Sequence, residues 1–168
     1  MHNSKNEYIE IAESQPPTLL LKLANPMMKL LLKSPLHGWV DEDYILLRWR
    51  GRRTGNRYST PVGYHQDGSK LTVFSFSGWR ANFEQPHPAE VKLKGRWRTG
   101  VGVLERDPRT CAAFIRDSIG DGDLSAYRWF RMQIVGDRHP TIEELVPEVE
   151  KRDMALVFIT LEEDEVGR

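Results

Sequence analysis

The chain of 168 residues has little that could form a covalent or metal-binding framework. It contains a single cysteine, Cys111, which excludes an intrachain disulfide and any metal site built from several thiolates. Cys111 lies in a helical pattern beside Ala112 and Phe114, so we expect a buried apolar residue rather than a nucleophile. We expect no metal site from the histidines, which are scattered with no pair four residues apart: His2, His37, His65, His87 and His139.

Long apolar runs and net charge are also absent. No run approaches the roughly 20 apolar residues that a membrane-spanning helix needs. The start of the chain lacks the basic and then apolar pattern of a secretory signal. We therefore expect a cytoplasmic protein without a membrane span. Because 24 Lys and Arg residues balance 24 Asp and Glu residues, general binding to nucleic acid or to a membrane surface is not expected.

Familiar catalytic motifs are missing as well. The sequence has no G-x-S-x-G, no P-loop, and no G-x-G-x-x-G between a strand and a helix. A nucleophilic or metal-dependent hydrolase is therefore poorly supported, and no catalytic residue can be assigned.

Positive charge is nevertheless concentrated in one stretch, RWRGRRTGNR (48–57), which has five arginines and no acidic residue. Arginine forks match phosphate and carboxylate oxygens, and glycines let backbone N–H groups approach an anion. We expect a turn here in which Gly51 and Gly55 are free to take positive φ. Composition alone leaves three interpretations: a solvated hairpin, an anion-binding nest, or nucleic-acid binding that weakens steeply with salt.

The middle of the chain alternates apolar and polar residues, as half-buried strands do. In the stretch YILLRWR, the apolar face carries Ile45, Leu47 and Trp49. Asp67-Gly68 predicts a tight hairpin, and Pro61 marks a sheet edge or a bulge. The predicted strands are 44–50, 57–66, 70–76, 89–95 and 96–105.

The last third of the chain changes to helical patterns. Asp107-Pro108 is typical of a helix start, and Asp123 or Ser125 is expected to cap a second helix that runs through Ile134. Thr141 and Glu144 have capping-box spacing and open a third helix. The short apolar run 154–161 predicts a buried final strand.

These elements predict an α+β fold, mainly antiparallel, built on a small barrel with helices inserted before the last strand. Residues 1–17 are predicted as a flexible N-terminal arm, and residues 18–168 as a single domain. The domain is expected to begin with leucine-rich helices before and after Pro26.

Three stretches resemble the deazaflavin-dependent nitroreductase family. They are NPMMKLLLKSPLHG (25–38), ILLRWRGRRTGNRYSTPVGYHQDG (45–68) and WRANF (79–83). The core of the match is G-R-x-[ST]-G followed by x-P-[LV], and the likeness covers about residues 25–106. The resemblance implies a split β-barrel like that of the flavin-binding pyridoxamine-phosphate oxidases.

The resemblance also implies coenzyme F420, with FMN as the alternative. The anionic tail would be held by Arg52, Arg53, Thr54, Gly55 and Arg57. By analogy, the loop after the third predicted strand would hold the ring and Asn82 would fix that loop. The full set of implied cofactor residues is Gly51, Arg52, Arg53, Thr54, Gly55, Arg57, Tyr58, Pro61, Val62, Ser75, Phe76, Ser77, Gly78, Trp79 and Asn82.

By the same resemblance, the protein would pass a hydride from reduced F420 to an electron-poor quinone, nitroaromatic or enone. Trp39 and Tyr64 are the candidate residues of the acceptor pocket. The alternatives are an FMN-binding oxidoreductase and a non-catalytic protein that binds the cofactor or a tetrapyrrole. We expect a small-molecule acceptor as partner, no nucleic acid, and either a monomer or a homodimer.

Overall fold

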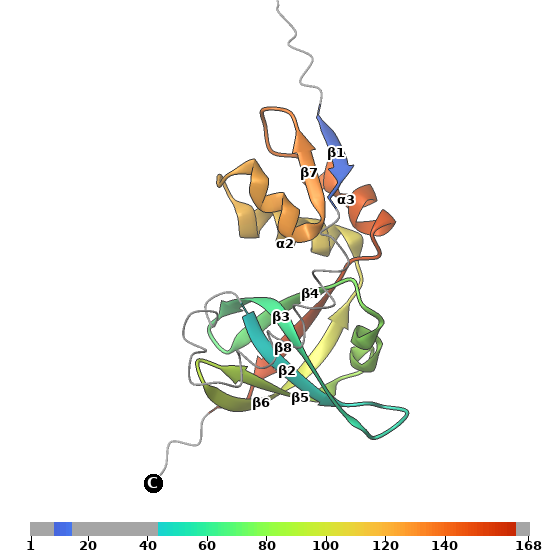
Figure 1. Ribbon diagram of the computed structural model, residues 1–168, viewed down its shortest axis with the longest axis vertical. Helices are drawn as coiled ribbons and strands as arrows, with labels where there is room; N and C mark the ends of the chain where they lie inside the picture. Colours follow the sequence, from blue (N-terminus) through green and yellow to red (C-terminus); the bar gives the residue numbers. More distant parts are fainter. Residues whose placement is uncertain (1–8, 15–43, 164–168) are drawn as a thin grey trace, which may run out of the picture.

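A computed structural model describes residues 9–14 and 44–163 of the chain. Its centre is a closed barrel of six antiparallel strands in the order β2-β3-β4-β8-β6-β5, with β5 pairing back to β2 (Figure 1). The α+β class and the antiparallel barrel predicted from the sequence are therefore confirmed. The barrel strands are β2 (Tyr44–Arg50), β3 (Arg57–Asp67), β4 (Lys70–Ser75), β5 (His87–Leu93), β6 (Arg96–Glu105) and β8 (Ala155–Leu161).

The barrel interior is filled by apolar side chains that point inward from every second residue of its strands. Ile45, Leu47 and Trp49 of β2 are buried there, as the period of two predicts. The late apolar run becomes β8, which enters between β4 and β6 and completes the barrel. The whole segment between β6 and β8 is thus an excursion from the barrel.

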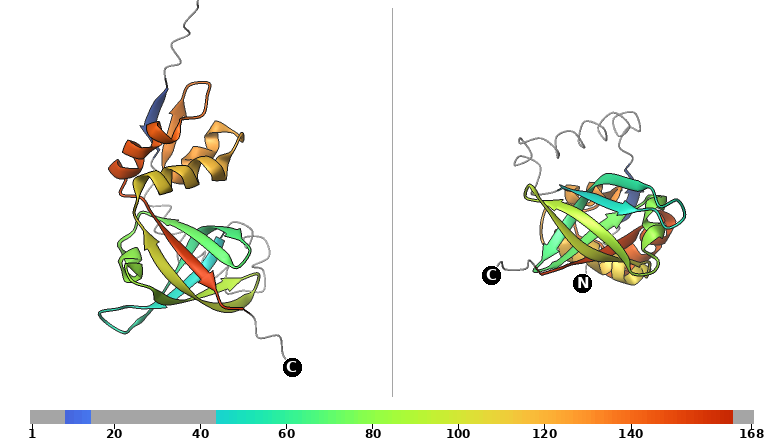
Figure 2. Two further views of the ribbon diagram at one scale, coloured as in Figure 1. Left: turned by 180° about the vertical axis from the view of Figure 1, so that it is seen from behind. Right: turned by 90° about the horizontal axis from the view of Figure 1, so that it is seen from below.

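That excursion forms a second layer at one end of the barrel (Figures 1 and 2). Its apolar cluster includes the fully buried Cys111, Tyr127 and Leu145, and it reaches the barrel strands through Leu156 of β8. Burial raises the pKa of the Cys111 thiol to about 11, which fits the predicted apolar role rather than a nucleophile. The layer contains α2 (Pro108–Ile119), η3 (Leu124–Phe130), β7 (Met132–Val135) and α3 (Ile142–Lys151).

Two of the predicted helix starts are confirmed by their caps. The Asp107 carboxylate accepts a hydrogen bond from the Thr110 backbone N–H at 2.8 Å, and Pro108 is the first residue of α2. At α3, the Thr141 hydroxyl accepts from the Glu144 N–H, and the Glu144 carboxylate accepts from the Thr141 N–H. This reciprocal pair satisfies two backbone donors that the helix itself cannot.

Glu144 is expected to make the stability of the protein depend on acid pH. Hydrogen bonds from Arg138 and from the Thr141 backbone lower its pKa from 4.5 to about 2. Because the folded pKa is depressed, the stabilisation is present above the unfolded pKa and is lost as the pH falls through the folded one. We expect Glu144→Gln to cost about 1 kcal/mol at neutral pH.

Urea unfolding of the wild type and of Glu144→Gln, at about pH 7 and at about pH 2, measures this. The other carboxyl groups are common to both proteins, so the difference between the two curves isolates Glu144. A difference that stays the same at both pH values would contradict the assignment.

Two predicted segments are corrected. Residues 123–134 do not form one helix: the 3₁₀ helix η3, capped by Asp123, ends at Phe130, and Met132–Val135 is a strand. The left-handed φ of 57° at Arg131 separates the two. Four residues of the predicted arm form strand β1 (Glu10–Glu13), which pairs with β7, so these four are not a flexible arm.

Other expectations lie outside the described residues. The leucine-rich helices around Pro26 and the segment 25–38 fall in that part of the chain. The division into an arm (1–17) and a single domain (18–168) stays a prediction. Within the described ranges, no helix has the length and apolar character needed to cross a membrane.

Candidate functional site

The arginine-rich stretch forms the tight hairpin that joins β2 to β3. This hairpin projects from the barrel at the end opposite the α2 and α3 layer (Figure 1). The Gly51 N–H donates to the Asn56 carbonyl at 2.9 Å, and the Gly55 N–H donates to the Gly51 carbonyl at 2.8 Å. Gly55 has φ of 67°, as predicted, and this conformation explains why a glycine is needed there.

Gly51 is needed for a different reason from the one predicted. Its φ is not positive, but a Cβ atom at this position would lie 2.7 Å from Cε2 of Tyr58 and 2.8 Å from Oγ1 of Thr54. These two side chains also meet each other, with 3.1 Å between their hydroxyl oxygens. The missing side chain of Gly51 therefore lets Tyr58 and Thr54 close over the base of the hairpin.

A cavity of about 430 Å³ opens beside this hairpin, and we call it the turn cavity. Its size falls in the range of about 300–1,000 Å³ that small-molecule sites occupy. Residues from β2, the hairpin, β3 and the 3₁₀ helix η2 (Gly78–Phe83) enclose it. The lining residues are Trp49, Gly51, Arg52, Arg53, Thr54, Tyr58, Trp79, Ala81, Asn82 and Glu84.

Aromatic rings give the turn cavity its apolar surface. The ring centroids of Trp49 and Tyr58 are 5.9 Å apart with nearly parallel planes, and those of Trp49 and Trp79 are 5.2 Å apart. Phe83 backs this group at 6.2 Å from Trp49. Trp49 also has a buried indole N–H without a hydrogen-bond partner among the described residues. Such a surface suits a flat aromatic molecule.

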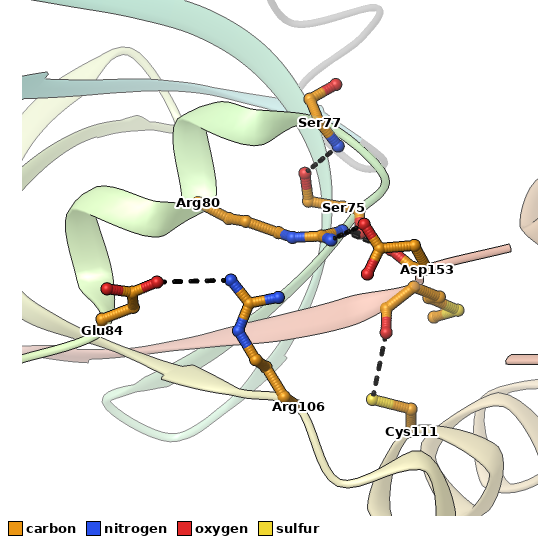
Figure 3. Close-up of polar contacts among 8 residues, drawn as sticks. Ser75, Ser77, Arg80, Glu84, Arg106, Cys111 and Asp153 are labelled. Atoms are coloured by element: carbon orange, nitrogen blue, oxygen red, sulfur yellow. Dashed lines mark hydrogen bonds and ion pairs between the residues drawn. The ribbon is translucent and has the colours of Figure 1, made fainter. Parts of the chain in front are cut away.

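Two arginines at the rim of the turn cavity, Arg52 and Arg53, differ in whether a carboxylate neutralises them. The Arg52 guanidinium is paired with Glu84 at 3.1 Å, and Arg106 approaches the same carboxylate at 3.5 Å (Figure 3). Arg53 is exposed and has no hydrogen-bond or ion-pair partner within the described ranges. The uncompensated positive charge of the turn cavity is therefore that of Arg53.

Asn82 holds the two walls of the cavity together. Its side-chain oxygen accepts a hydrogen bond from the Arg52 backbone N–H at 3.0 Å. Its side-chain nitrogen donates to the Trp79 carbonyl at 2.7 Å. The single amide thus ties the hairpin to η2.

Arg80 anchors η2 to two neighbouring segments of the chain (Figure 3). Its guanidinium is buried, with 3% of the residue exposed, and it donates to the Ser75 carbonyl at 2.8 Å. It also donates to the backbone carbonyl and to the carboxylate of Asp153. Ser75 in turn accepts from the Ser77 N–H through its hydroxyl at 3.0 Å. One side chain therefore fixes η2 to the end of β4 and to the turn that precedes β8.

The structure brings together only part of the predicted site. Seven of the implied cofactor residues line the turn cavity: Gly51, Arg52, Arg53, Thr54, Tyr58, Trp79 and Asn82. Arg57 lines another cavity with Arg48 and Arg50, so the five arginines of 48–57 do not form one cradle.

The other predicted residues lie elsewhere. Val62 is buried in the barrel core, and Phe76 packs against the second layer, with the Arg131 guanidinium 4.4 Å from its ring centroid. Tyr64 lines a third cavity with Phe74 and Phe114. Gly55, Pro61, Ser75, Ser77 and Gly78 line none of these three cavities. Trp39 lies outside the described residues.

Sequence reasoning missed two important residues of the cavity. Trp49 was predicted only as a core residue of its strand, and it both fills the barrel and forms the cavity floor. Glu84 carried no signal, because its role depends on the approach of Arg52 from a hairpin 32 residues away. No group of His, Cys, Asp and Glu suited to a metal ion occurs in the described part of the chain.

No protein-family profile and no curated protein matches this chain. Among solved structures, it is similar to an F420 reductase, with 14% identity over 80% of this chain and 93% of that one, and a TM-score of 0.39. It is also similar to the FAD- and heme-binding protein of Mycobacterium smegmatis, with 15% identity, 79% and 68% coverage, and a TM-score of 0.43.

A third similar structure is an FAD-binding protein of Mesorhizobium loti, with 12% identity over 92% of this chain and 94% of that one, and a TM-score of 0.37. At these identities and TM-scores the likenesses carry no argument about activity. The function proposed below rests on the side chains of the turn cavity.

Proposed function

We propose that the turn cavity binds a flat redox cofactor with an anionic tail, coenzyme F420, and that the protein is an F420-dependent reductase. The observation that carries the proposal is the pairing of an aromatic wall with one uncompensated arginine. Trp49, Tyr58 and Trp79 line the cavity, and Arg53 stands at its rim with no carboxylate of the described residues paired to it.

The residues present fit such a cofactor. A tricyclic ring buries apolar faces against aromatic side chains, and a phosphate or carboxylate tail matches the fork of a guanidinium. Arg53 and the Thr54 hydroxyl would hold the tail. Arg52 contributes less charge, because Glu84 already neutralises it. FMN carries the same two features and is the alternative ligand.

The cofactor supplies the chemistry as a hydride donor to an electron-poor acceptor such as a quinone, a nitroaromatic or an enone. The residues of this chain then have three tasks: to bind the ring, to orient it, and to exclude water from it. The aromatic wall binds the ring. The Asn82 contacts between η2 and the hairpin orient the ring, because they set the distance between the two walls of the cavity.

Arg53→Ala is expected to weaken the binding of oxidised F420 at least about tenfold, since one charge-assisted contact with the tail is lost. Fluorescence titration of the purified protein measures this. Arg96→Ala is the matched control, because Arg96 is also exposed, lacks a partner within the described ranges, and lines none of the three cavities. Circular dichroism of both variants checks the fold.

The outcomes separate the alternatives. Tight binding of F420 that Arg53→Ala weakens and Arg96→Ala spares supports the proposal, and turnover of reduced F420 with an acceptor then distinguishes a reductase from a non-catalytic binder. Binding of FMN in place of F420 assigns the alternative cofactor. If neither ligand binds, the hairpin is a solvated turn and the proposal is wrong.

A further inference from the structure

A second cavity lies on the outer face of the barrel, and the proposed function does not use it. Its volume is about 450 Å³, and we call it the outer cavity. Its polar lining comes from β2, β3, β5 and β6 and from the residue after β8, and consists of Arg48, Arg50, Arg57, His87, Glu90, Thr99 and Glu162. Arg48 and Arg50 alternate with the inward-facing Leu47 and Trp49 along β2, so these two arginines point away from the barrel core.

Two arginines oppose each other directly across this face. Arg50 of β2 and Arg57 of β3 are Cα partners in the antiparallel register, which places their side chains on the same face of the sheet. Like charges directly opposite on neighbouring strands repel and destabilise the pair. An anion bound between the two cations would relieve this repulsion.

No carboxylate of the described part of the chain forms an ion pair with either arginine, and the Glu162 carboxylate in the lining accepts from the Thr99 hydroxyl instead. Arg50 donates to the Gly55 carbonyl at 3.2 Å, which satisfies one donor but leaves the charge. Arg57 has no hydrogen-bond or ion-pair partner there. Glu90 is engaged by Arg48 at 3.6 Å, and Arg48 is itself held 3.6 Å above the ring centroid of Trp97.

His87 completes the polar edge of the outer cavity. Its Nε2 atom lies 2.6 Å from the Arg50 carbonyl oxygen, and since a carbonyl can only accept, Nε2 carries the hydrogen and donates. This contact holds the backbone of Arg50 beside β5. Arg50 is therefore held by the hairpin through the Gly55 carbonyl and by β5 through His87.

We infer that the outer cavity is a second anion site, which binds a multiply charged oxyanion of the phosphate or polycarboxylate class between Arg50 and Arg57. Each guanidinium presents several N–H donors, so two of them can share one dianion with charge-assisted hydrogen bonds. The bound anion removes the repulsion between the two arginines. This site is separate from the turn cavity, whose cation is Arg53.

The test is calorimetric titration with pyrophosphate and, in a second arm, with citrate, at low ionic strength because screening weakens exposed contacts. We expect Arg57→Gln to weaken binding about tenfold, the loss of one charge-assisted contact. Arg96→Gln is the control and is expected to leave binding unchanged. The tighter of the two probes assigns the class of oxyanion.

A second readout separates binding from a merely structural role. Without any anion at low salt, Arg57→Gln is expected to raise Tm, because it removes the repulsion from Arg50. Pyrophosphate is then expected to raise Tm of the wild type more than that of the variant. If Arg57 only supported the fold, Arg57→Gln would lower Tm in the measurement without anion.

Three results overturn the inference: no binding of either probe, equal weakening by Arg57→Gln and Arg96→Gln, or weakening by Arg53→Gln with none by Arg57→Gln. The last would place the anion in the turn cavity. Because F420 binding is tested through Arg53 and oxyanion binding through Arg57, either proposal can fail while the other stands.

Discussion

Replacing Phe83 with alanine is expected to lower the free energy of unfolding by about 3–5 kcal/mol, the cost of a large cavity in a packed core. Phe83 is fully buried and lies at the end of η2, where it contacts the barrel interior. Its ring centroid is 6.2 Å from that of Trp49 and 5.9 Å from that of Trp79. The substitution therefore also removes the support of two rings that line the turn cavity.

The packing of Phe83 also explains a glycine of β6. A Cβ atom on Gly102 would lie 2.5 Å from Cδ1 of Phe83, a separation that the buried ring cannot relieve by moving. Gly102→Ala is thus expected to cost about 1–3 kcal/mol by overpacking. In the background of Phe83→Ala the same change should cost little, because the ring that it strikes is gone.

A double-mutant cycle in urea measures this coupling between Phe83 and Gly102. Phe83→Leu serves as a control, since it keeps most of the apolar volume and should cost less than alanine. If Gly102→Ala costs the same with and without the Phe83 ring, contact with that ring is not what excludes a side chain at position 102.

Arg80→Met is expected to lower the free energy of unfolding by about 2–5 kcal/mol, because it leaves one buried and one partly buried carbonyl without a donor. Methionine keeps the apolar stem of Arg80 but cannot donate to the Ser75 and Asp153 carbonyls. The end of β4 and the start of η2 then lose their common anchor. We expect the binding of F420 to weaken in parallel, since η2 carries Trp79 and Asn82.

Asp153→Asn is the matched control for Arg80. The side chain of Asp153 is 78% exposed, and asparagine tolerates its left-handed φ of 47°. Because asparagine keeps a side-chain oxygen that can accept from the buried Arg80 guanidinium, this substitution should cost less than Arg80→Met. If Asp153→Asn is as damaging as Arg80→Met, the ion pair and not the carbonyl contacts holds η2 in place.

Local patterns in the sequence were enough to predict most of the fold. Alternation over residues 44–50, the Asp67-Gly68 turn and the capping box at Thr141 each depend on neighbours a few residues apart. The segment 123–134 was mispredicted as one helix because its apolar spacing suits either structure. Its strand half forms only by pairing Met132–Val135 with β1, more than a hundred residues away.

The candidate site was likewise predicted in part from local sequence and decided in part by tertiary contacts. A surplus of arginine and glycine at 48–57 marked the hairpin, and the resemblance added Trp79 and Asn82. Which arginines face which cavity was not encoded locally. The side-chain alternation of two paired strands sends Arg50 and Arg57 to the outer face, while the turn leaves Arg53 beside the aromatic wall.

By itself, the sequence determined the class of the fold and the place of the charged hairpin. These follow from periodicity, turn residues and side-chain chemistry, which act over short distances along the chain. Only the tertiary structure decided that Glu84 neutralises Arg52 and that Arg80 anchors η2. It also decided that the arginines serve two separate cavities, because closing the barrel brings these distant strands and loops into contact.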